Sequence, residues 1–545
     1  MSAYTKAIAM LFIKKGVFYM NTTKRVLCML LVLVMLVCAF AGCTEKPNSN
    51  DPKDTDETTG NDDGTKDDES DDDEESTVPE DIDTSHLNES YMWEDKIQEY
   101  RILSRSSTAY EFESPDTGTL SGVQQAVFNR NSTVEERCNI EITVIPQAGD
   151  WVAVPGNSEF MQTVRNNGKL DNSAYELIAT HQAYLVNLAV EGYGWDFAEL
   201  PGVDLTKRWW SAAFYETANY NGAQYVAYGD IAYTLYSYMM VVFFNSQVAE
   251  DYGIDEDFYD LALDGDWTFE KMKTYTQMVT TDLEAAEEDR EYGFVTNGHS
   301  IRNFSCGGFE IDLIPVKTDG MRETKPTNFK LSVDAEQKLQ SVADFLQETN
   351  QVYCVFSGNN GAEEGNNIFK SGRALFYTQM LGEAVVFKET LRDSYGVMPL
   401  PKYDDNQKNY HTGVRDTVTG ILVPYNVRLS DMAGIVVEML SMESFFEVTE
   451  AYYEDTIKYK SFNDPKCVAS LELIRKSFDP AWELAYSNCI NTCYSLISNL
   501  VETNISKGTD NQVATYFSST ASAWPRSVRD LYTALDKIAA DRAAA

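Results

Sequence analysis

The stretch Tyr100-Arg-Ile-Leu-Ser104, the segment Gly122–Cys138 and the run Ile140-Glu-Ile-Thr-Val-Ile145 decide the fold of this chain. The first is a short apolar run and the third alternates apolar and polar residues, so both are predicted to be strands. The segment between them carries valines at positions 123, 127 and 134 on one stripe, which is typical of an amphipathic helix. A strand, a helix and a second strand in this order predict parallel strands with a covering helix, and therefore an α/β fold.

The same alternation of strands and helices continues toward the C-terminus. Thr268 is a predicted N-cap and Asp334 a predicted first helical residue, because apolar residues recur at helical spacing after each of them. From Ser430 onward the pattern is mostly helical, and no internal repeat is found. The remaining predictions are a helix over Phe160–Asn166 and strands over Tyr175–Thr180, Val241–Phe244, Ala374–Tyr377 and Gly420–Val423.

A basic residue followed by a short apolar run precedes this body, from Arg25 to Cys43. Ala41 and Gly42 stand directly before Cys43, the order of a secretory signal with a cleavage site, and a cysteine at that point resembles the lipobox of bacterial lipoproteins. The alternative is a membrane anchor, but 17 residues between Val26 and Gly42 fall short of the ~20 that a spanning helix needs. We therefore expect residues 1–42 to be a signal peptide, with translation from Met1 or Met20, and Cys43 to carry the lipid.

An acidic low-complexity segment follows, and we expect residues 43–90 to be a disordered tether. Residues 44–90 hold 19 acidic residues and 3 lysines, too little apolar surface to fold. The body from residue 91 to 545 is also acidic, because the whole chain of 545 residues has a net charge of −41. Such a surface repels nucleic acid and other polyanions. A body of this length exceeds one hydrophobic core, so two or more lobes are expected.

Enzymatic and metal-binding motifs are missing from the sequence. Four histidines occur without an HxxxH spacing, and there is no CxxC, GxSxG, phosphate-binding loop or GxGxxG. Six body cysteines are too scattered for a disulfide scaffold, and Cys489 and Cys493 are predicted to share a helix face as ordinary thiols. We expect no catalytic residue, no metal and no cofactor.

Aromatic residues crowd the span from Trp209 to Tyr238. Trp209-Trp210 and seven tyrosines lie there together with Gly229 and Asp230. Aromatic rings stack on the apolar faces of sugars, while carboxylates and amides bind the hydroxyl groups. Most of these rings are expected in the core, with two or three of them in a binding site.

The order of several motifs resembles the family 1 extracellular solute-binding proteins, the lipoprotein receptors of ABC importers. The resemblance covers roughly residues 95–545, and it lies in the order and spacing of the motifs rather than in any single one. The motifs are Asn221–Gly229 with Val241–Asn245, Asp266-Trp-Thr-Phe-Glu270, Tyr292-Gly-Phe294, Phe369–Tyr377, Tyr395-Gly-Val-Met-Pro-Leu-Pro401 and Tyr410–Asp416.

This resemblance implies a periplasmic-binding-protein-like fold of type II, with a ligand cleft between two α/β lobes joined by crossover strands. Lobe one is expected to take about 91–235 and 415–460, and lobe two about 240–412 and 461–545. Ligands in such folds meet the carboxyl ends of strands. That rule and the aromatic span select the predicted ligand-binding residues Arg105, His181, Gln182, Tyr184, Trp210, Tyr228, Asp230, Tyr233, Trp267, Gln379 and His411.

The sequence therefore predicts a lipid-anchored receptor on the outer face of the cell membrane. We expect a monomer that captures a small molecule, an oligosaccharide above others, and docks on the permease subunits of an importer. A peptide receptor of the same fold, a glycoside hydrolase lipoprotein and a surface adhesion protein are the alternatives. A hydrolase needs two carboxylates about 5–9 Å apart in the cleft, and an adhesion protein needs no deep pocket.

Overall fold

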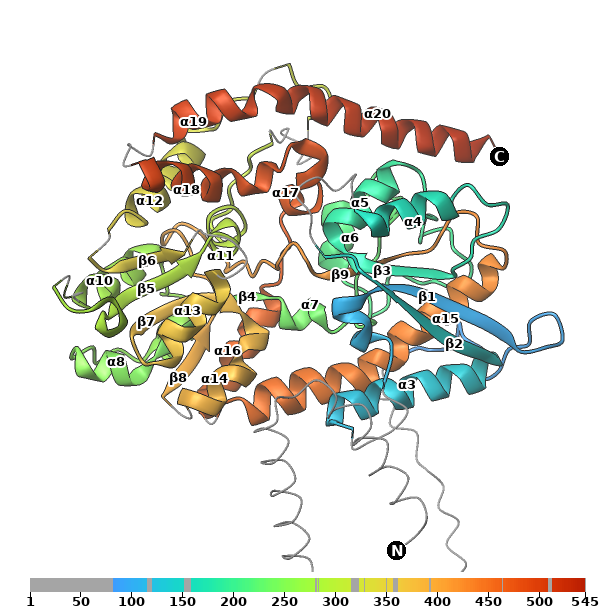
Figure 1. Ribbon diagram of the computed structural model, residues 1–545, viewed down its shortest axis with the longest axis horizontal. Helices are drawn as coiled ribbons and strands as arrows, with labels where there is room; N and C mark the ends of the chain where they lie inside the picture. Colours follow the sequence, from blue (N-terminus) through green and yellow to red (C-terminus); the bar gives the residue numbers. More distant parts are fainter. Residues whose placement is uncertain are drawn as a thin grey trace, which may run out of the picture. The chain divides into compact units, whose positions relative to one another are not determined.

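Two β-sheets form the framework of the computed structural model (Figure 1). The structure describes residues 82–114, 120–150, 158–279, 282, 284–314, 323–327, 329–348, 350–355, 361–391, 394–462, 464–507 and 512–544. All of them lie within one compact unit that spans Thr77–Ala545. The predicted signal peptide, Cys43, Met20 and most of the predicted tether lie outside the described residues.

The first sheet belongs to lobe one and has the order β2-β1-β3-β9. Its strands are β1 (Gln98–Arg105), β2 (Ile140–Gln147), β3 (Leu177–His181) and β9 (Thr419–Leu422). β1 pairs in parallel with both β2 and β3, as the strand-helix-strand pattern predicts, and only β9 runs antiparallel. Side chains alternate between the two faces: Leu103 and Ile178 join the larger core, whereas Ile102 and Leu177 join a second one.

The helices of lobe one cover both faces of this sheet. α3 (Gly122–Cys138) has the predicted bounds because Ser121 and Gln124 form a capping box at its start, while Asn139 takes a left-handed conformation at its end. The other helices are α4 (Glu159–Asn167), α5 (Gln182–Val190), α6 (Ala212–Ala218) and α15 (Ser430–Glu443), with a short 3₁₀ turn, η2 (Ser106–Glu111), after β1.

The second sheet belongs to lobe two and has the order β6-β5-β7-β4-β8. Its strands are β4 (Met240–Asn245), β5 (Tyr292–Asn297), β6 (Val352–Val355), β7 (Ala374–Met380) and β8 (Tyr395–Met398). β5 is parallel to β6 and β7, whereas β4 is antiparallel to both of its neighbours. Each strand predicted from the sequence is present in one of the two sheets.

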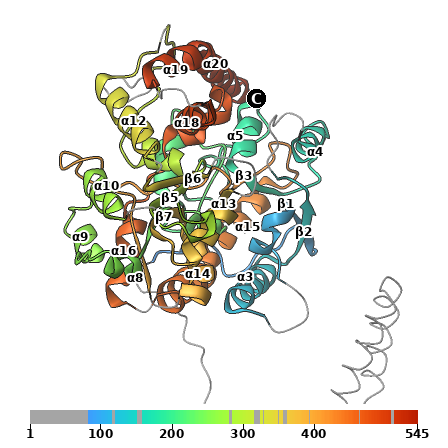
Figure 2. The same ribbon diagram turned by 60° about the vertical axis from the view of Figure 1, so that its left-hand side comes forward.

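Short and medium helices surround the second sheet (Figure 2). In α10 (Phe269–Met278), Thr268 is the predicted cap and accepts from the backbone N–H of Lys271. Ser332 rather than Asp334 starts α12 (Val333–Phe345), since the Ser332 hydroxyl accepts from the N–H of Ala335. The others are α8 (Ser246–Asp251), α9 (Phe258–Leu263), α11 (Ser300–Arg302), α13 (Gly361–Lys370), α14 (Ala384–Leu391) and α16 (Pro465–Lys476).

Three segments cross between the lobes. α7 (Thr234–Ser237) leads into β4, and the returning chain runs beside it, with Met239 and Val414 forming an antiparallel bridge. The N–H of Met240 donates to the carbonyl of Gly413 and that of Arg415 to the carbonyl of Tyr238. The third crossing continues α15 through the π-helical segments η7 (Ser444–Val448) and η8 (Glu450–Lys460). These are the crossover connections that the resemblance implied.

The C-terminal region departs from the predicted lobe boundaries. α16 packs on β8 and α9, and α18 (Leu496–Lys507) and α19 (Val513–Thr520) pack with α12, all within lobe two. α17 (Trp482–Ala485), however, contacts α5 and α6, and α20 (Trp524–Ala543) contacts α5 and the 3₁₀ turn η9 (Ser487–Ile490). Residues 461–545 therefore do not belong to lobe two alone, because two of their helices also pack against lobe one.

Two local predictions need correction. Residues 82–90 were expected in the tether, but Leu87 is buried and His86 Nε2 lies 3.0 Å from Glu438 Oε1, so this segment packs on the body. Cys489 and Cys493 do not share a helix face, because Asn491 and Thr492 adopt positive φ angles and separate η9 from η10 (Cys493–Ser495). None of the six described cysteines is in a disulfide.

Candidate functional site

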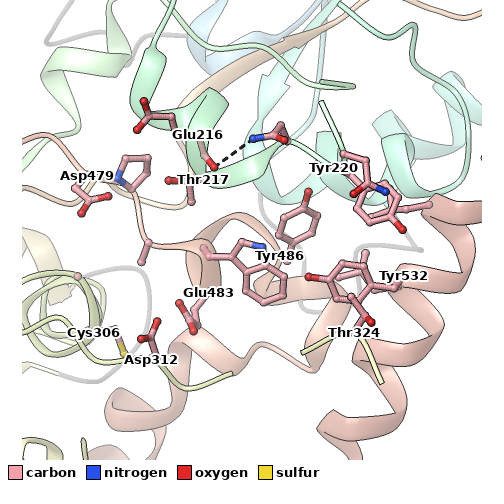
Figure 3. A pocket seen from close by; sticks show the side chains of 18 of the residues that line it. Glu216, Thr217, Tyr220, Cys306, Asp312, Thr324, Asp479, Glu483, Tyr486 and Tyr532 are labelled. Atoms are coloured by element: carbon pink, nitrogen blue, oxygen red, sulfur yellow. Dashed lines mark hydrogen bonds between the residues drawn. The ribbon is translucent and has the colours of Figure 1, made fainter. Parts of the chain in front are cut away.

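A pocket of about 890 Å³ lies where segments of both lobes meet the C-terminal helix (Figure 3). Lobe one contributes the end of α6 and the residues after it, from Glu216 to Asn221. Lobe two contributes residues 306–312 and 324–325, and the chain between and after the crossovers contributes His411 and residues 479–486. α20 closes the remaining side with residues between Arg529 and Asp536.

Two pairs of aromatic rings form part of the pocket wall. Trp482 and Tyr486 lie one helical turn apart, so they share a face, and their ring centroids are 4.8 Å apart. The hydroxyl of Tyr486 donates to the carbonyl of Ala218 at 2.6 Å, which fixes this ring against α6. Tyr220 and Tyr532 form the second pair at 5.7 Å, and Figure 3 shows Tyr220, Tyr486 and Tyr532 reaching the same space from different elements.

Carboxylates dominate the polar part of the lining. Glu483 is buried and accepts from the backbone N–H groups of Leu313 and Ile314 at 3.1 and 3.2 Å, so one of its oxygens holds the lobe-two loop in place. The amide of Asn219 donates to the carbonyl of Glu216 at 3.3 Å. The acidic side chains of the lining outnumber the basic ones; the acids are Glu216, Glu310, Asp312, Asp479, Glu483 and Asp536, and the bases are Lys325, His411 and Arg529.

His411 links two of these carboxylates at the edge of the pocket. Its Nδ1 lies 2.7 Å from Asp479 and its Nε2 lies 2.7 Å from Glu310. Burial of the ring opposes protonation, but the bonds to both carboxylates outweigh it and raise the pKa of His411 above its usual range. Glu310 holds a φ of 53°, which is uncommon for a residue with a long side chain, so its loop is held in a specific conformation beside the pocket.

The residues predicted at the ends of β1 and β3 lie where the strand order places them, but deep in the structure. Arg105 is buried and donates through Nη2 to the carbonyl of Thr417 at 3.1 Å. Burial, aided by the charge of Arg105, lowers the pKa of His181 to about 3. Gln182 donates to the carbonyl of Leu484 at 2.6 Å, and Tyr184 to that of Asp150 at 2.9 Å. Gln182 thus joins α5 to α17 behind the pocket wall.

The aromatic residues between Trp209 and Tyr238, where a binding site was expected, lie mostly in the hydrophobic core. Trp210 is buried and its Nε1 donates to Glu438 at 2.8 Å; Tyr228 is buried with its ring stacked on Phe214 at 3.8 Å. Asp230 accepts from the hydroxyls of Tyr236 and Thr449, and its burial raises its pKa to about 6. These three side chains have no open face in this structure, so their contacts are those of structural residues.

The remaining predicted ligand-binding residues are buried, half-buried or at the pocket. Trp267 has no exposed surface and donates from Nε1 to the carbonyl of Pro399 at 3.0 Å, while Gln379 is buried and donates to the hydroxyl of Tyr377 at 2.8 Å. Tyr233 is half-buried, with its ring between those of Tyr110 and Tyr452 at 5.7 and 4.7 Å. Of the predicted set, only His411 lines the pocket of Figure 3.

Sequence reasoning missed the C-terminal half of the pocket. Trp482 and Tyr486 stand at i,i+4 after Pro480, and Tyr532 and Asp536 stand at the same spacing in the final helix. This spacing is the one feature of the sequence that places these side chains in pairs on a helix face. It does not identify a binding site by itself, because residues that pack in the core have the same spacing.

Within the described residues, no group of three or more histidines, cysteines and carboxylates is arranged to hold a metal ion. No helix in the described part of the chain is long and apolar enough to cross a membrane.

Comparison with solved structures defines the class of fold. A cyclo/maltodextrin-binding protein in complex with maltotetraose matches with a TM-score of 0.51 and 14% identity, over 82% of this chain and 98% of that one. An ABC transporter solute-binding protein from Thermotoga lettingae, bound to α-D-tagatose, matches with a TM-score of 0.50 and 13% identity, over 80% and 99%. The chain therefore has the α/β two-sheet fold of type II periplasmic binding proteins, as the sequence resemblance implied.

Sequence-level comparison adds no closer relative. No protein-family model matches the chain. No curated protein matches it either.

Proposed function

We propose that this protein is the substrate-binding component of an ABC importer and captures an oligosaccharide in the pocket between α6, α17 and α20. The observation that carries the proposal is the pairing of two aromatic walls, Trp482 with Tyr486 and Tyr220 with Tyr532, inside one pocket of about 890 Å³. Aromatic rings cover the apolar faces of sugar rings, and the surrounding carboxylates accept from hydroxyl groups.

The fold supports the same proposal. The solved proteins with this fold are named as binding proteins, and one holds maltotetraose and another tagatose. Here, residues from 216–221 of lobe one and from 306–312 of lobe two line the same pocket. A ligand that contacts both stabilises the conformation in which the lobes are closed, and a permease can recognise that conformation.

The proposal includes the lipid anchor at Cys43 and a place on the outer face of the cell membrane, both argued from the signal-like sequence before the acidic tether. We propose a receptor rather than a hydrolase. Glu310 and Asp479 line the pocket, but both are bonded to the same histidine, His411, which leaves neither poised as an acid and base pair around a substrate.

Calorimetric titration of the purified protein with a panel of linear and cyclic oligosaccharides and short peptides tests the proposal. We expect saturable binding of at least one oligosaccharide, no hydrolysis products by chromatography, and a loss of affinity in Trp482→Ala and Tyr532→Ala variants. Binding of peptides alone, or release of shorter sugars, refutes the proposal in favour of one of its rivals. Carbohydrate binding that is insensitive to both pocket residues refutes the location of the site.

A further inference from the structure

The final helix, α20, is attached to both lobes. Its first turns belong to lobe two: Trp524 is buried, with its ring 5.5 Å from that of Phe517 and 6.5 Å from that of Phe329. Arg529, one turn later, donates from Nη1 to the carbonyl of Pro326 at 2.5 Å. Both contacts are with segments that pack on the lobe-two side of the pocket.

The last turns of α20 belong to lobe one. Arg542 donates to the carbonyl of Gly194, and its guanidinium lies 4.5 Å from the ring centroid of Tyr225 and 5.1 Å from that of Tyr425. Between these ends, the hydroxyl of Tyr220 donates to the carboxylate of Asp536. Burial of the ring and this bond raise the pKa of Tyr220 to about 12.

The middle of the helix forms a wall of the pocket. Tyr532 and Asp536 line it, and each contacts Tyr220 on the opposite, lobe-one side. Figure 1 shows α20 running from α19 across to the side of α5. Any movement that separates residues 216–221 from the lobe-two loops must therefore either carry α20 with one lobe or break its contacts with the other.

The lobe-one contacts are the weaker attachment. The lobe-two end buries the whole indole of Trp524, whereas none of residues 536–543 at the lobe-one end is buried. There, Ile538 packs only partly buried against the core and Arg542 lies partly exposed between two tyrosines, while Asp536 accepts from Tyr220. A stacked cation contributes less than a fully buried tryptophan. Opening is thus expected to start at residues 532–543, with the helix remaining on lobe two.

We propose that α20 is a strap across the pocket, and that its C-terminal half must release from lobe one before a ligand enters or leaves. The control of ligand exchange by α20 rests on the proposed function of the pocket. The preferential release of residues 532–543 from lobe one does not, because it is a property of the protein without ligand.

Arg542→Ala tests the strap, because Arg542 does not line the pocket, and Arg526→Ala is the matched control. Arg526 lies on the same helix, but its side chain is 82% exposed and bonds Asp530 on α20 itself. Arg542→Lys keeps the charge and loses the planar stacking of the guanidinium on the two tyrosines. Thermal unfolding of each variant verifies that the fold is retained.

Hydrogen–deuterium exchange of the ligand-free protein is the first measurement. In Arg542→Ala, amides of residues 532–543 should exchange about tenfold faster while residues 524–530 keep their rates, with a smaller effect in Arg542→Lys and none in Arg526→Ala. Equal rates in wild type and Arg542→Ala, or uniform acceleration along all of α20, overturn the strap.

Stopped-flow mixing with the tightest oligosaccharide found by titration is the second measurement. A strap that is closed on both the empty and the filled pocket limits both directions, so Arg542→Ala should raise association and dissociation rates together and leave Kd within about twofold. A change in the dissociation rate alone means that Arg542 holds ligand directly and overturns the gating role. If the wild-type protein binds no oligosaccharide, the proposed function is wrong. The hydrogen–deuterium exchange measurement still tests whether residues 532–543 are released from lobe one.

Discussion

Replacing Trp482 with alanine separates a ligand-binding ring from a structural one most directly. The Trp482 side chain is only partly buried, and its neighbour Tyr486 is held independently by its bond to the carbonyl of Ala218. The substitution therefore removes one stacking surface and leaves the second aromatic pair, Tyr220 and Tyr532, in place. Loss of stacking and burial against a sugar ring costs on the order of 2 kcal/mol, or about a 30-fold rise in Kd.

The matched comparison is Trp267, which has 0% exposure and donates to the carbonyl of Pro399. Trp267→Ala should cost about 3–5 kcal/mol of stability through the cavity that it leaves, and Trp267→Phe less, with Kd unchanged wherever the protein stays folded. Calorimetric titration and urea unfolding on each variant measure both quantities. If Trp482→Ala binds with wild-type affinity, or if it lowers stability as much as Trp267→Ala does, the assignment of Trp482 to the site is wrong.

Four further predictions concern titration, burial and anchoring. The pKa of His411 is raised in the folded protein, so the ring stabilises the fold fully below its unfolded pKa of about 6.5, and this stabilisation is lost as the pH rises through its folded pKa. Urea unfolding between pH 6 and 9 should show this loss in the wild-type protein and not in His411→Asn. Asp230 is a carboxyl whose pKa is raised to about 6, so its contribution to stability falls as pH rises from about 4 to past 6, and Asp230→Asn should remove this fall without changing Kd. A chain that begins at residue 91 should be about 2 kcal/mol less stable than one that begins at residue 77, because it lacks the buried Leu87, and an equal Tm for the two contradicts the ordered start seen here. Cys43→Ala should abolish incorporation of a fatty-acid probe and release the protein from the membrane fraction; labelling that survives the substitution places the lipid elsewhere.

Local patterns were enough to predict most of the framework. The strands predicted over 100–104 and 140–145 follow from residue spacing, and the structure has them over 98–105 and 140–147. The helix between them follows from its spacing and from capping groups at Ser121 and Asn139, which act on residues close to them in the sequence. The parallel pairing of β1 with β2 follows as well, since a strand-helix-strand unit has one favoured connection. The crossovers near 240 and 412 were implied by the family resemblance rather than by local patterns, and they lie side by side in the structure.

The site depended on contacts that no local pattern contains. Trp210 and Trp482 are the same residue type beside other aromatic residues, yet Trp210 bonds Glu438, 228 positions away, and is core, whereas Trp482 lines the pocket. The lining comes from α6, the loops of lobe two and α20, which meet only after both lobes and the C-terminal helices have packed. Periodicity determines which face of an element is apolar, but only tertiary packing determines whether that face is covered by protein or left open to a ligand.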